Sequence, residues 1–388
     1  MRRGFVFVLV FSLLVFIPVM GVRVALSLYA LDLGAGAFEV GVIGAASQIP
    51  MLLFSLPVAA MLERYGPRVT LAASALCGIA GTLLPWAWPD VSALVIASFL
   101  FGTSNVLAFQ PGQTLVGLLG RPETLARDFS VYAFFSSLSA LFGPVASGLA
   151  IDAAGHRSGF LVFLAFELSA LALVLTAGRV LPAAGKARAH TGGGGLGETL
   201  RNRKVWRLIA ISGLSGIGLD LFPFFVPLYG HAAGLSASVI GATVSVAAIG
   251  MILLPVLLPF LARTCGEERV MAACLGVMGI AFLMLLPPGN VPLLVAASFL
   301  YGLACYAANP LTSTLAWAHL PPGVAARFLA VRNTGNAALR VVIAPVFGAL
   351  AAGLGLAAGI AVSAAIMGAS GLWVGARRRF AAVPRAAR

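Results

Sequence analysis

The chain has 388 residues, of which 60% belong to the hydrophobic set and only 10% are charged. Soluble domains average about 45–50% apolar and about 25% charged residues, so a mean hydropathy of +1.02 excludes a soluble enzyme, a disordered tail and a disulfide-stapled secreted scaffold. The net charge of +13, from 25 Lys and Arg against 12 Asp and Glu, first indicates membrane topology rather than a polyanionic partner.

Uncharged apolar segments predict twelve transmembrane helices. In the first half, runs without charged residues cover 4–22, 40–62, 69–89, 91–120 and 129–151, and a sixth at 158–178 is interrupted only by Glu167. In the second half, turn-forming sequences separate helices at roughly 208–230, 239–262, 270–286, 292–318, 329–352 and 356–376. These lengths suit a helix that crosses a bilayer, which needs about 20 residues, and the short alternating strands of a membrane β-barrel are absent.

The placement of basic residues supports this count and predicts the orientation. With the N-terminus inside, 21 of the 25 Lys and Arg fall in cytoplasmic segments, Arg157 falls in an outer loop and three Arg lie within helices. This bias follows the positive-inside rule. We therefore expect a multi-pass protein of the cell (inner or cytoplasmic) membrane with both termini in the cytoplasm. The expected partners are membrane lipids and a small-molecule substrate, without nucleic acid, and we expect a monomer.

The two halves of the chain repeat at an offset of 200 residues. LYALDLGAGAFEVGVIGA at 28–45 aligns with LYGHAAGLSASVIGATVS at 228–245, and Gly66 falls on Gly266. Parallel repeats of this kind characterise transporters that bind their substrate between the halves, near the bilayer midplane. The predicted units are an N-terminal six-helix bundle at 1–178, a cytoplasmic linker at 179–207, a C-terminal six-helix bundle at 208–376 and a basic cytoplasmic tail at 377–388.

The segment between the second and third helices resembles the most diagnostic motif of the major facilitator superfamily. The family pattern is Gly-x-Leu-x-Asp-Arg-x-Gly-Arg-Arg/Lys followed by an aliphatic residue, and here 59–71 reads AAMLERYGPRVTL. Glu63 stands at the acidic position, while Arg64, Gly66 and Arg68 match directly. The resemblance covers essentially the whole chain. It implies an all-α integral membrane fold of twelve helices arranged as two six-helix bundles.

In this family the motif gates the cytoplasmic side, because its acid and Arg latch neighbouring helix ends. By this resemblance Glu63 would engage the start of helix 11, near Arg332. Arg64 would seek Glu123 or Asp128. An ordinary positively charged inside loop is the simpler explanation of the Arg residues, but it does not account for Gly66 and its repeat.

A second resemblance lies in the fifth helix, at GPVASG. Drug–proton antiporters of the superfamily often carry a longer Gly-rich form that ends in Gly-Pro-x-x-Gly-Gly, and this chain keeps Gly143, Pro144 and Gly148. The resemblance favours efflux by an antiporter, although a proline kink without bearing on direction explains the same residues equally well. Proton-coupled drug exporters usually carry an Arg in helix 4, where this chain has Ser98, so protons would need another group.

Five ionisable residues lie within predicted helices, where a charge costs about 2.5–3.5 kcal/mol on insertion scales. They are Arg23, Glu167, Asp220, Arg332 and Arg340. Asp220, near mid-membrane, is the candidate proton-coupling carboxylate, with Arg340 or Arg23 as its exchangeable partner. A static buried pair that only fixes helix packing is the alternative. Glu167 lies in a peripheral helix, and Arg332 is close enough to the cytoplasmic end to snorkel.

Neutral polar residues complete the predicted substrate site. Asn333, Asn336 and Arg340 are spaced i, i+3 and i+7, so they form one polar stripe on helix 11. The resemblance implies that helices 1, 4, 7 and 10 line the cavity, with helices 5 and 11 beside them. Three further amides in helices 4 and 10 add hydrogen-bonding groups: Gln110, Gln113 and Asn309.

We therefore predict a secondary transporter that moves a small organic solute by alternating access, with a proton gradient as driving force, no metal or cofactor, and export favoured over uptake. Two Arg in the cavity suit a substrate with anionic character. The alternatives are a transport-inactive receptor or scaffold with the same fold, and an uptake symporter or uniporter for an anionic metabolite. A membrane-embedded enzyme is disfavoured because the four His are scattered in loops or at helix ends.

Overall fold

The computed structural model describes residues 3–120, 125–182, 203–287, 289–305, 311–312 and 322–376, which form helices and turns without a strand among them. Only the backbone is described at 125–126, 203–205, 207–208, 255–256, 259, 322–330 and 333. The predicted tail at 377–388 and most of the predicted linker lie outside the described residues.

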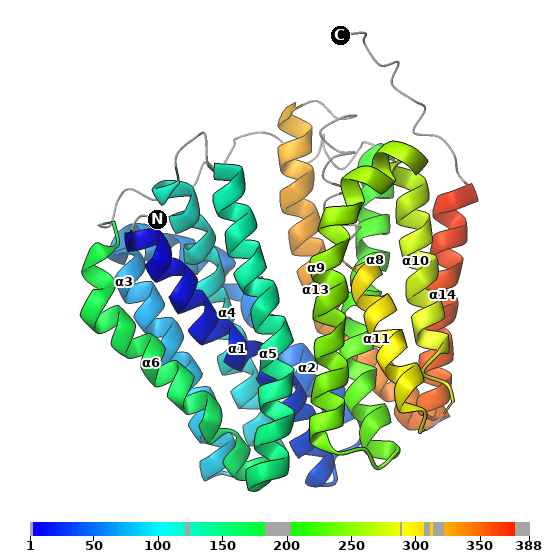
Figure 1. Cartoon of the computed structure of the whole chain (residues 1–388), viewed down its shortest axis with the longest axis horizontal. Coiled ribbons are helices and arrows are strands. Elements are labelled where there is room, and N and C mark those ends of the chain that lie inside the picture. Colours follow the sequence, from blue (N-terminus) through cyan, green and yellow to red (C-terminus); the bar gives the residue numbers. More distant parts are fainter. Residues whose placement is uncertain are drawn as a thin grey trace.

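The N-terminal half is a bundle of long helices joined by short turns, and residues 3 and 376 lie at the same end of the molecule (Figure 1). The first helix extends to Asp32, beyond the uncharged run that ends at residue 22, and Arg23 lies inside it as predicted. The helices are α1 (Arg3–Asp32), α2 (Ala37–Ala46), α3 (Ile49–Ala87), α4 (Val91–Leu119), α5 (Leu125–Gly159) and α6 (Leu161–Ala177), followed by the 3-10 turn η1 (Gly178–Val180).

The C-terminal half is a second bundle beside the first. Its helices are α8 (Arg203–Ala232), α9 (Ala237–Cys265), α10 (Glu267–Leu283), α11 (Val291–Cys305), α13 (Pro322–Leu354) and α14 (Leu356–Ala376). We call the end of the molecule that holds the start of α1 and the end of α14 the terminal end, and the other the distal end (Figure 1).

Within the described residues, nine stretches are long and apolar enough to cross a membrane. One of them, Ala37–Ala87, has 51 residues, or about 77 Å of helix at 1.5 Å per residue, which is more than twice a bilayer core. It breaks at Gly66, whose φ of 79° suits glycine, so it supplies two crossings. With the shorter apolar helices α10 and α11, the described structure is consistent with the twelve predicted helices.

The repeat at an offset of 200 residues is preserved in the backbone. Helix α1 ends in a Schellman motif in which Ala35 N–H donates to the Ala30 carbonyl at 2.9 Å, and α8 ends in the same motif, with Leu235 N–H donating to the Gly230 carbonyl at 2.9 Å. Glycines with positive φ recur in register through the chain. They pair as Gly34 with Gly234, Gly66 with Gly266, and Gly155 with Gly355.

The halves meet chiefly through two pairs of helices, α2 with α13 and α5 with α9, with smaller contacts of α1 with α8 and of α3 with α13. A methyl group on Gly41 of α2 would lie 2.5 Å from the carbonyl oxygen of Ala344, and one on Gly241 of α9 would lie 2.2 Å from that of Pro144. The two contacts are equivalent under the repeat, as a two-fold relation between the halves requires. Both lie toward the distal end, where α2 and α9 begin, and glycine lets the backbones approach this closely.

Candidate functional site

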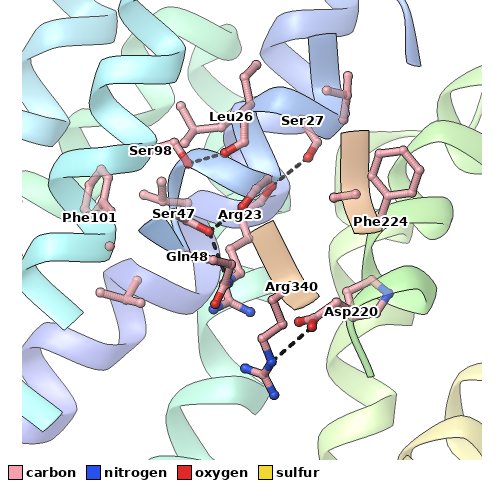
Figure 2. Close-up of a pocket in the computed structure, with 18 of the residues that line it drawn as sticks. Arg23, Leu26, Ser27, Ser47, Gln48, Ser98, Phe101, Asp220, Phe224 and Arg340 are labelled. Carbon is pink, nitrogen blue, oxygen red and sulfur yellow. Dashed lines mark hydrogen bonds and ion pairs between the residues drawn. The ribbon is translucent and has the colours of Figure 1, made fainter. Parts of the chain in front are cut away.

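A cavity that is partly open to its surroundings lies between the halves (Figure 2). Its walls come from α1, α2 and α4 of the N-terminal half and from α8 and α13 of the C-terminal half. Most lining side chains are apolar, and the charged ones are Arg23, Asp220 and Arg340. Three of the five intramembrane charges identified in the sequence therefore share one cavity.

Asp220 of α8 and Arg340 of α13 form an ion pair in this cavity. Their Oδ2 and Nε atoms are 3.1 Å apart, and their side chains are 15% and 28% exposed. The two groups lack the alignment of a hydrogen bond. Asp220 is about 18 Å from the distal end of its helix, which places it near mid-membrane. Arg340 is thus the direct partner, while Arg23 acts on Asp220 electrostatically from α1.

Helix α2 contributes lining residues that the sequence analysis missed. It stops at Ala46 and the chain resumes as α3 at Ile49, because Pro50 cannot donate a hydrogen bond to the preceding turn. Ser47 and Gln48 lie in this break and face the cavity, and the Gln48 amide donates to Ser47 Oγ at 3.2 Å. A polar pair just before a proline in an apolar helix is the sequence signal that could have located them.

The predicted stripe on α13 does not act as a unit in the cavity. Arg340 lines the cavity, but the Asn336 amide donates to Ser212 Oγ at 2.9 Å and so ties α13 to α8. Two further amides are predicted for the site. The side chain of Asn333 and the whole of Asn309 lie outside the described residues.

The predicted amides of α4 lie outside the cavity lining. Gln110 is about 7 Å further along the helix axis than Asn105, the α4 amide that does line the cavity, and Gln113 lies further still. The sequence does not reveal the depth of the cavity along helix 4, so a role for these two amides in substrate binding stays a prediction.

The motif around Gly66 is held within the N-terminal half. The Arg68 guanidinium donates to the Leu175 carbonyl of α6 at 3.0 Å, and the Arg64 guanidinium lies 5.2 Å from the centre of the Tyr65 ring. The side chains at 322–330, where the latch of Glu63 is expected to form, lie outside the described residues, and Arg332 donates to Thr312 Oγ1. Glu123 also lies outside the described residues, and a contact between Arg64 and Asp128 stays a prediction.

The other two intramembrane charges, Arg332 and Glu167, are buried among helices and do not line the cavity. The Arg332 side chain does not snorkel: the residue is 7% exposed and its guanidinium donates to Thr312 Oγ1 at 3.0 Å, which corrects the expectation. Glu167 of α6 is fully buried against α3, and its carboxyl oxygens have no hydrogen-bond partner among the described residues. A side chain at Gly78 would overlap the Glu167 carboxyl, so glycine leaves the room that it occupies.

The GPVASG segment packs α5 on two sides. A methyl group on Gly143 would lie 2.6 Å from the Ile17 carbonyl oxygen of α1, and one on Gly148 would lie 2.3 Å from the Ala237 carbonyl oxygen of α9. Since α1 belongs to the same half and α9 to the other, this segment joins the halves at the distal end. Its small residues therefore have a packing role that the structure makes explicit.

A carboxylate adds a polar contact to the same interface. Asp152 of α5 accepts hydrogen bonds from the backbone N–H groups of Ala237 at 3.1 Å and Ser238 at 2.9 Å. These N–H groups begin α9 and have no partner within it, so one half of the molecule caps a helix of the other half. The repeat equivalent of Asp152 is Ala352, so this cap exists on one of the two interfaces.

The wall of the cavity continues toward the terminal end along α1. This helix packs against α4, α5 and α6, and its partly exposed positions recur at spacings of three, four or seven residues, which places them on one face. Apart from Leu14 and from Arg3, Leu31 and Asp32 near the helix ends, they are Val6, Val10, Leu13, Met20, Arg23 and Ser27. The contacts that close the interface thus lie distally, whereas the face of α1 toward the termini stays accessible.

Among the described residues, no group of three or more His, Cys, Asp and Glu is placed to hold a metal ion. The four cysteines are unpaired by disulfides, and Cys265 is exposed. The chemistry that the cavity offers is therefore ionic and hydrogen-bonded recognition by Arg, Asp and neutral amides.

Comparison with known proteins shows which family and which solved structures share this architecture. The family model described as Major Facilitator Superfamily matches residues 7–263 and residues 212–388. A search of curated proteins by sequence gives no match. The fold resembles a crystal structure of a mutant of the nucleoside transporter NupG, with a TM-score of 0.82, 14% identity, and coverage of 96% of this chain and 99% of that one.

Two crystal structures of POT family transporters are similarly related. One is in complex with a thioalcohol conjugated peptide, with a TM-score of 0.78, 14% identity, and coverage of 96% of each chain. The other is in complex with 5-aminolevulinic acid, with a TM-score of 0.79, 14% identity, and coverage of 97% of this chain and 96% of that one. At this identity the similarity concerns the fold.

Proposed function

Because the chain belongs to the Major Facilitator Superfamily, we propose that it is a secondary transporter that moves a small organic solute across the membrane by alternating access. We place it in the cell membrane with both termini in the cytoplasm, on the strength of the basic residues in the predicted cytoplasmic segments. Export driven by a proton gradient is the proposed mode, and the resemblance of GPVASG to antiporter sequences favours this direction.

The observation that carries the proposal is a charged cavity between two halves whose described backbones approach closely at the distal end. In the proposed orientation the distal end faces outward, so the described state is closed to the outside and accessible from the cytoplasm. The opposite state requires α2 to separate from α13 and α5 from α9. The repeat makes these two interfaces equivalent, so a rocking motion of one bundle against the other opens both together.

The Asp220–Arg340 pair is the proposed coupling element. When Asp220 takes up a proton it loses its charge, and the attraction that holds Arg340 is lost with it. The loosened Arg340 then holds the substrate site together less well, so protonation weakens substrate binding, whereas departure of the proton restores the pair and the site. Proton and substrate thus bind alternately, as their exchange across the membrane requires. A pair that joins α8 to α13 without an aligned hydrogen bond suits such an exchange, because neither partner is held by a rigid fork.

Flux in proteoliposomes tests this coupling. A solute panel that includes nucleosides and small peptides is first screened by thermal shift, and each ligand is then followed with and without an imposed pH gradient. We expect Asp220→Asn to reduce gradient-driven accumulation at least about tenfold while solute exchange without a gradient persists. Glu167→Gln is the matched control, because it neutralises a membrane carboxylate outside the cavity. Unchanged accumulation by Asp220→Asn would refute the coupling role.

The same vesicles separate the proposal from a transport-inactive receptor. A receptor binds a ligand from the panel but never carries it across the membrane, in any gradient. Accumulation in right-side-out vesicles would instead support the uptake alternative, and accumulation in inside-out vesicles supports export.

A further inference from the structure

The guanidinium of Arg23 forms no direct ion pair within the described part of the chain, although it acts on the Asp220 carboxylate electrostatically from α1. Arg23 lines the cavity from α1, and its described hydrogen bond is through its backbone carbonyl, which accepts from Ser27 Oγ at 2.9 Å. Asp220, the carboxylate of this cavity, is in direct contact with Arg340. The charged lining residues therefore sum to one positive charge, held by a side chain with five free N–H donors.

An unpaired guanidinium at this depth requires an explanation. Arg23 is about 13 Å from the distal end of α1, well inside the helix. Charges in membrane segments face a cavity or a partner because insertion without either is costly. Among the residues that the structure describes, none forms an ion pair with Arg23 while its side chain faces the cavity, which is the arrangement expected when the counter-ion arrives with a ligand.

The surroundings of Arg23 define the rest of the ligand. Gln48 and Asn105 offer neutral hydrogen-bonding groups in the same cavity. Figure 2 shows Phe101 on one side of the cavity and Phe224 on the other, with Arg23 and Arg340 between them. A ligand that satisfies this cavity has one anionic group for Arg23 and an apolar or aromatic body for the two rings.

We propose that the substrate is a monoanionic, amphipathic organic acid, whose carboxylate or comparable oxyanion binds the Arg23 guanidinium and whose apolar body lies between Phe101 and Phe224. This deepens the proposed transport function, on which it rests, by excluding cations from the substrate class. A cation would add a second positive charge to a cavity that already carries one, whereas a monoanion neutralises it. Arg pairs with a carboxylate in a bidentate manner, which also orients the ligand.

Binding to the purified full-length protein tests this inference without transport. The probes are 4-phenylbutyrate, its uncharged amide 4-phenylbutyramide and its cationic counterpart 4-phenylbutylamine, extended by acids with longer or shorter chains. The three compounds have similar apolar parts and differ in their charge. We expect the acids to raise the melting temperature of the wild type and the amide and amine to leave it unchanged.

Substitution of Arg23 provides the second part of the binding test. We expect Arg23→Gln to weaken binding of the acid at least about tenfold and Arg23→Lys to retain part of it. Arg157→Gln is the matched control, since Arg157 donates to the Trp86 carbonyl at 2.6 Å and does not line the cavity. If Arg23→Gln is too unstable to purify, acid binding is compared between Arg23→Lys and the wild type, and a weaker binding by Arg23→Lys supports the inference.

The outcomes distinguish this inference from the proposed function. Acid binding that depends on Arg23 supports the inference even if no flux follows, and absent flux then refutes transport. Preferred binding of the amine, equal binding of acid and amide, or acid binding that survives Arg23→Gln unchanged would overturn the inference. Failure of every acid in the series to bind overturns it as well.

Discussion

At the residue scale, the informative side chains are charges that the membrane does not tolerate without a reason. Arg23, Asp220 and Arg340 share a cavity, whereas Glu167 is buried between helices of one half and Arg332 is bonded to Thr312. The cost of inserting a charge into the membrane is thus offset in two different ways. Where the charge faces a cavity we infer a role in binding, and where it is packed we infer a structural one.

Glu167 provides a test of that distinction. Its carboxyl is fully buried without a hydrogen-bond partner among the described residues, so an apolar side chain of similar volume suits the site better. We expect Glu167→Met to stabilise the protein by about 1 kcal/mol or more, which raises the melting temperature by roughly 2 °C, with transport retained. Thermal unfolding in detergent measures the change. A lower melting temperature or lost transport would show that the carboxyl is needed.

At the element scale, the distal contacts determine which side of the cavity is closed. Gly41, Gly148 and Gly241 bring backbones of opposite halves together, and Asp152 caps α9 across the interface. These contacts have to form and break once in each transport cycle. Substitutions there should therefore change the balance between the two states more than they change the fold of either half.

Asp152→Ala removes the cap between the halves. Loss of an N-cap costs about 1 kcal/mol, so we expect the population open at the distal end to rise about fivefold. A membrane-impermeant thiol reagent applied from outside reports this, with Ser27→Cys as the cavity reporter in a background without the native cysteines. Asp90→Ala is the matched control, since Asp90 caps α4 within one half through Ser92 N–H at 2.8 Å. Equal labelling of both variants would contradict the role of Asp152.

Gly148→Val is expected to prevent distal closure altogether. A side chain there meets the Ala237 backbone carbonyl, which cannot move aside as a flexible side chain would. We expect solute flux to fall at least about tenfold while reagent added outside reaches Ser27→Cys at a higher rate. Gly117→Val introduces the same side chain into α4, where nothing lies within 4 Å, and should retain flux. Normal flux by Gly148→Val would show that close approach of α5 and α9 is not required.

Much of this architecture is predictable because helix length and charge bias follow from the bilayer. The repeat, the reversal at Gly66 and the membrane depth of Asp220 all could be derived from sequence. Helix ends were less accurate, since the uncharged run of the first helix stops at residue 22 whereas the helix continues through Arg23 to Asp32. The break at Ser47 was missed because its polar groups matter only once the position of the cavity is known.

At the scale of the whole molecule, the two-fold relation between the halves explains why one cavity can face two sides. The distal interfaces are equivalent under the repeat, yet the halves differ where chemistry is needed. Asp220 and Arg340 belong to the C-terminal half, and Arg23 and the broken helix at Ser47 belong to the N-terminal half. A ligand held by both halves links their relative motion to its own binding and release.

The central claim is that the cavity opens alternately at the two ends, and distances between spin labels test it most directly. One pair, Ala154→Cys with Ala232→Cys, spans the halves at the distal end, and the other, Leu118→Cys with Thr264→Cys, spans them at the terminal end, each in a background without native cysteines. The account predicts that, in lipid nanodiscs under acidic and neutral conditions and with the ligand found by thermal shift, one distance lengthens whenever the other shortens. Distances that stay constant, or change in the same direction, in a protein that still transports would contradict it.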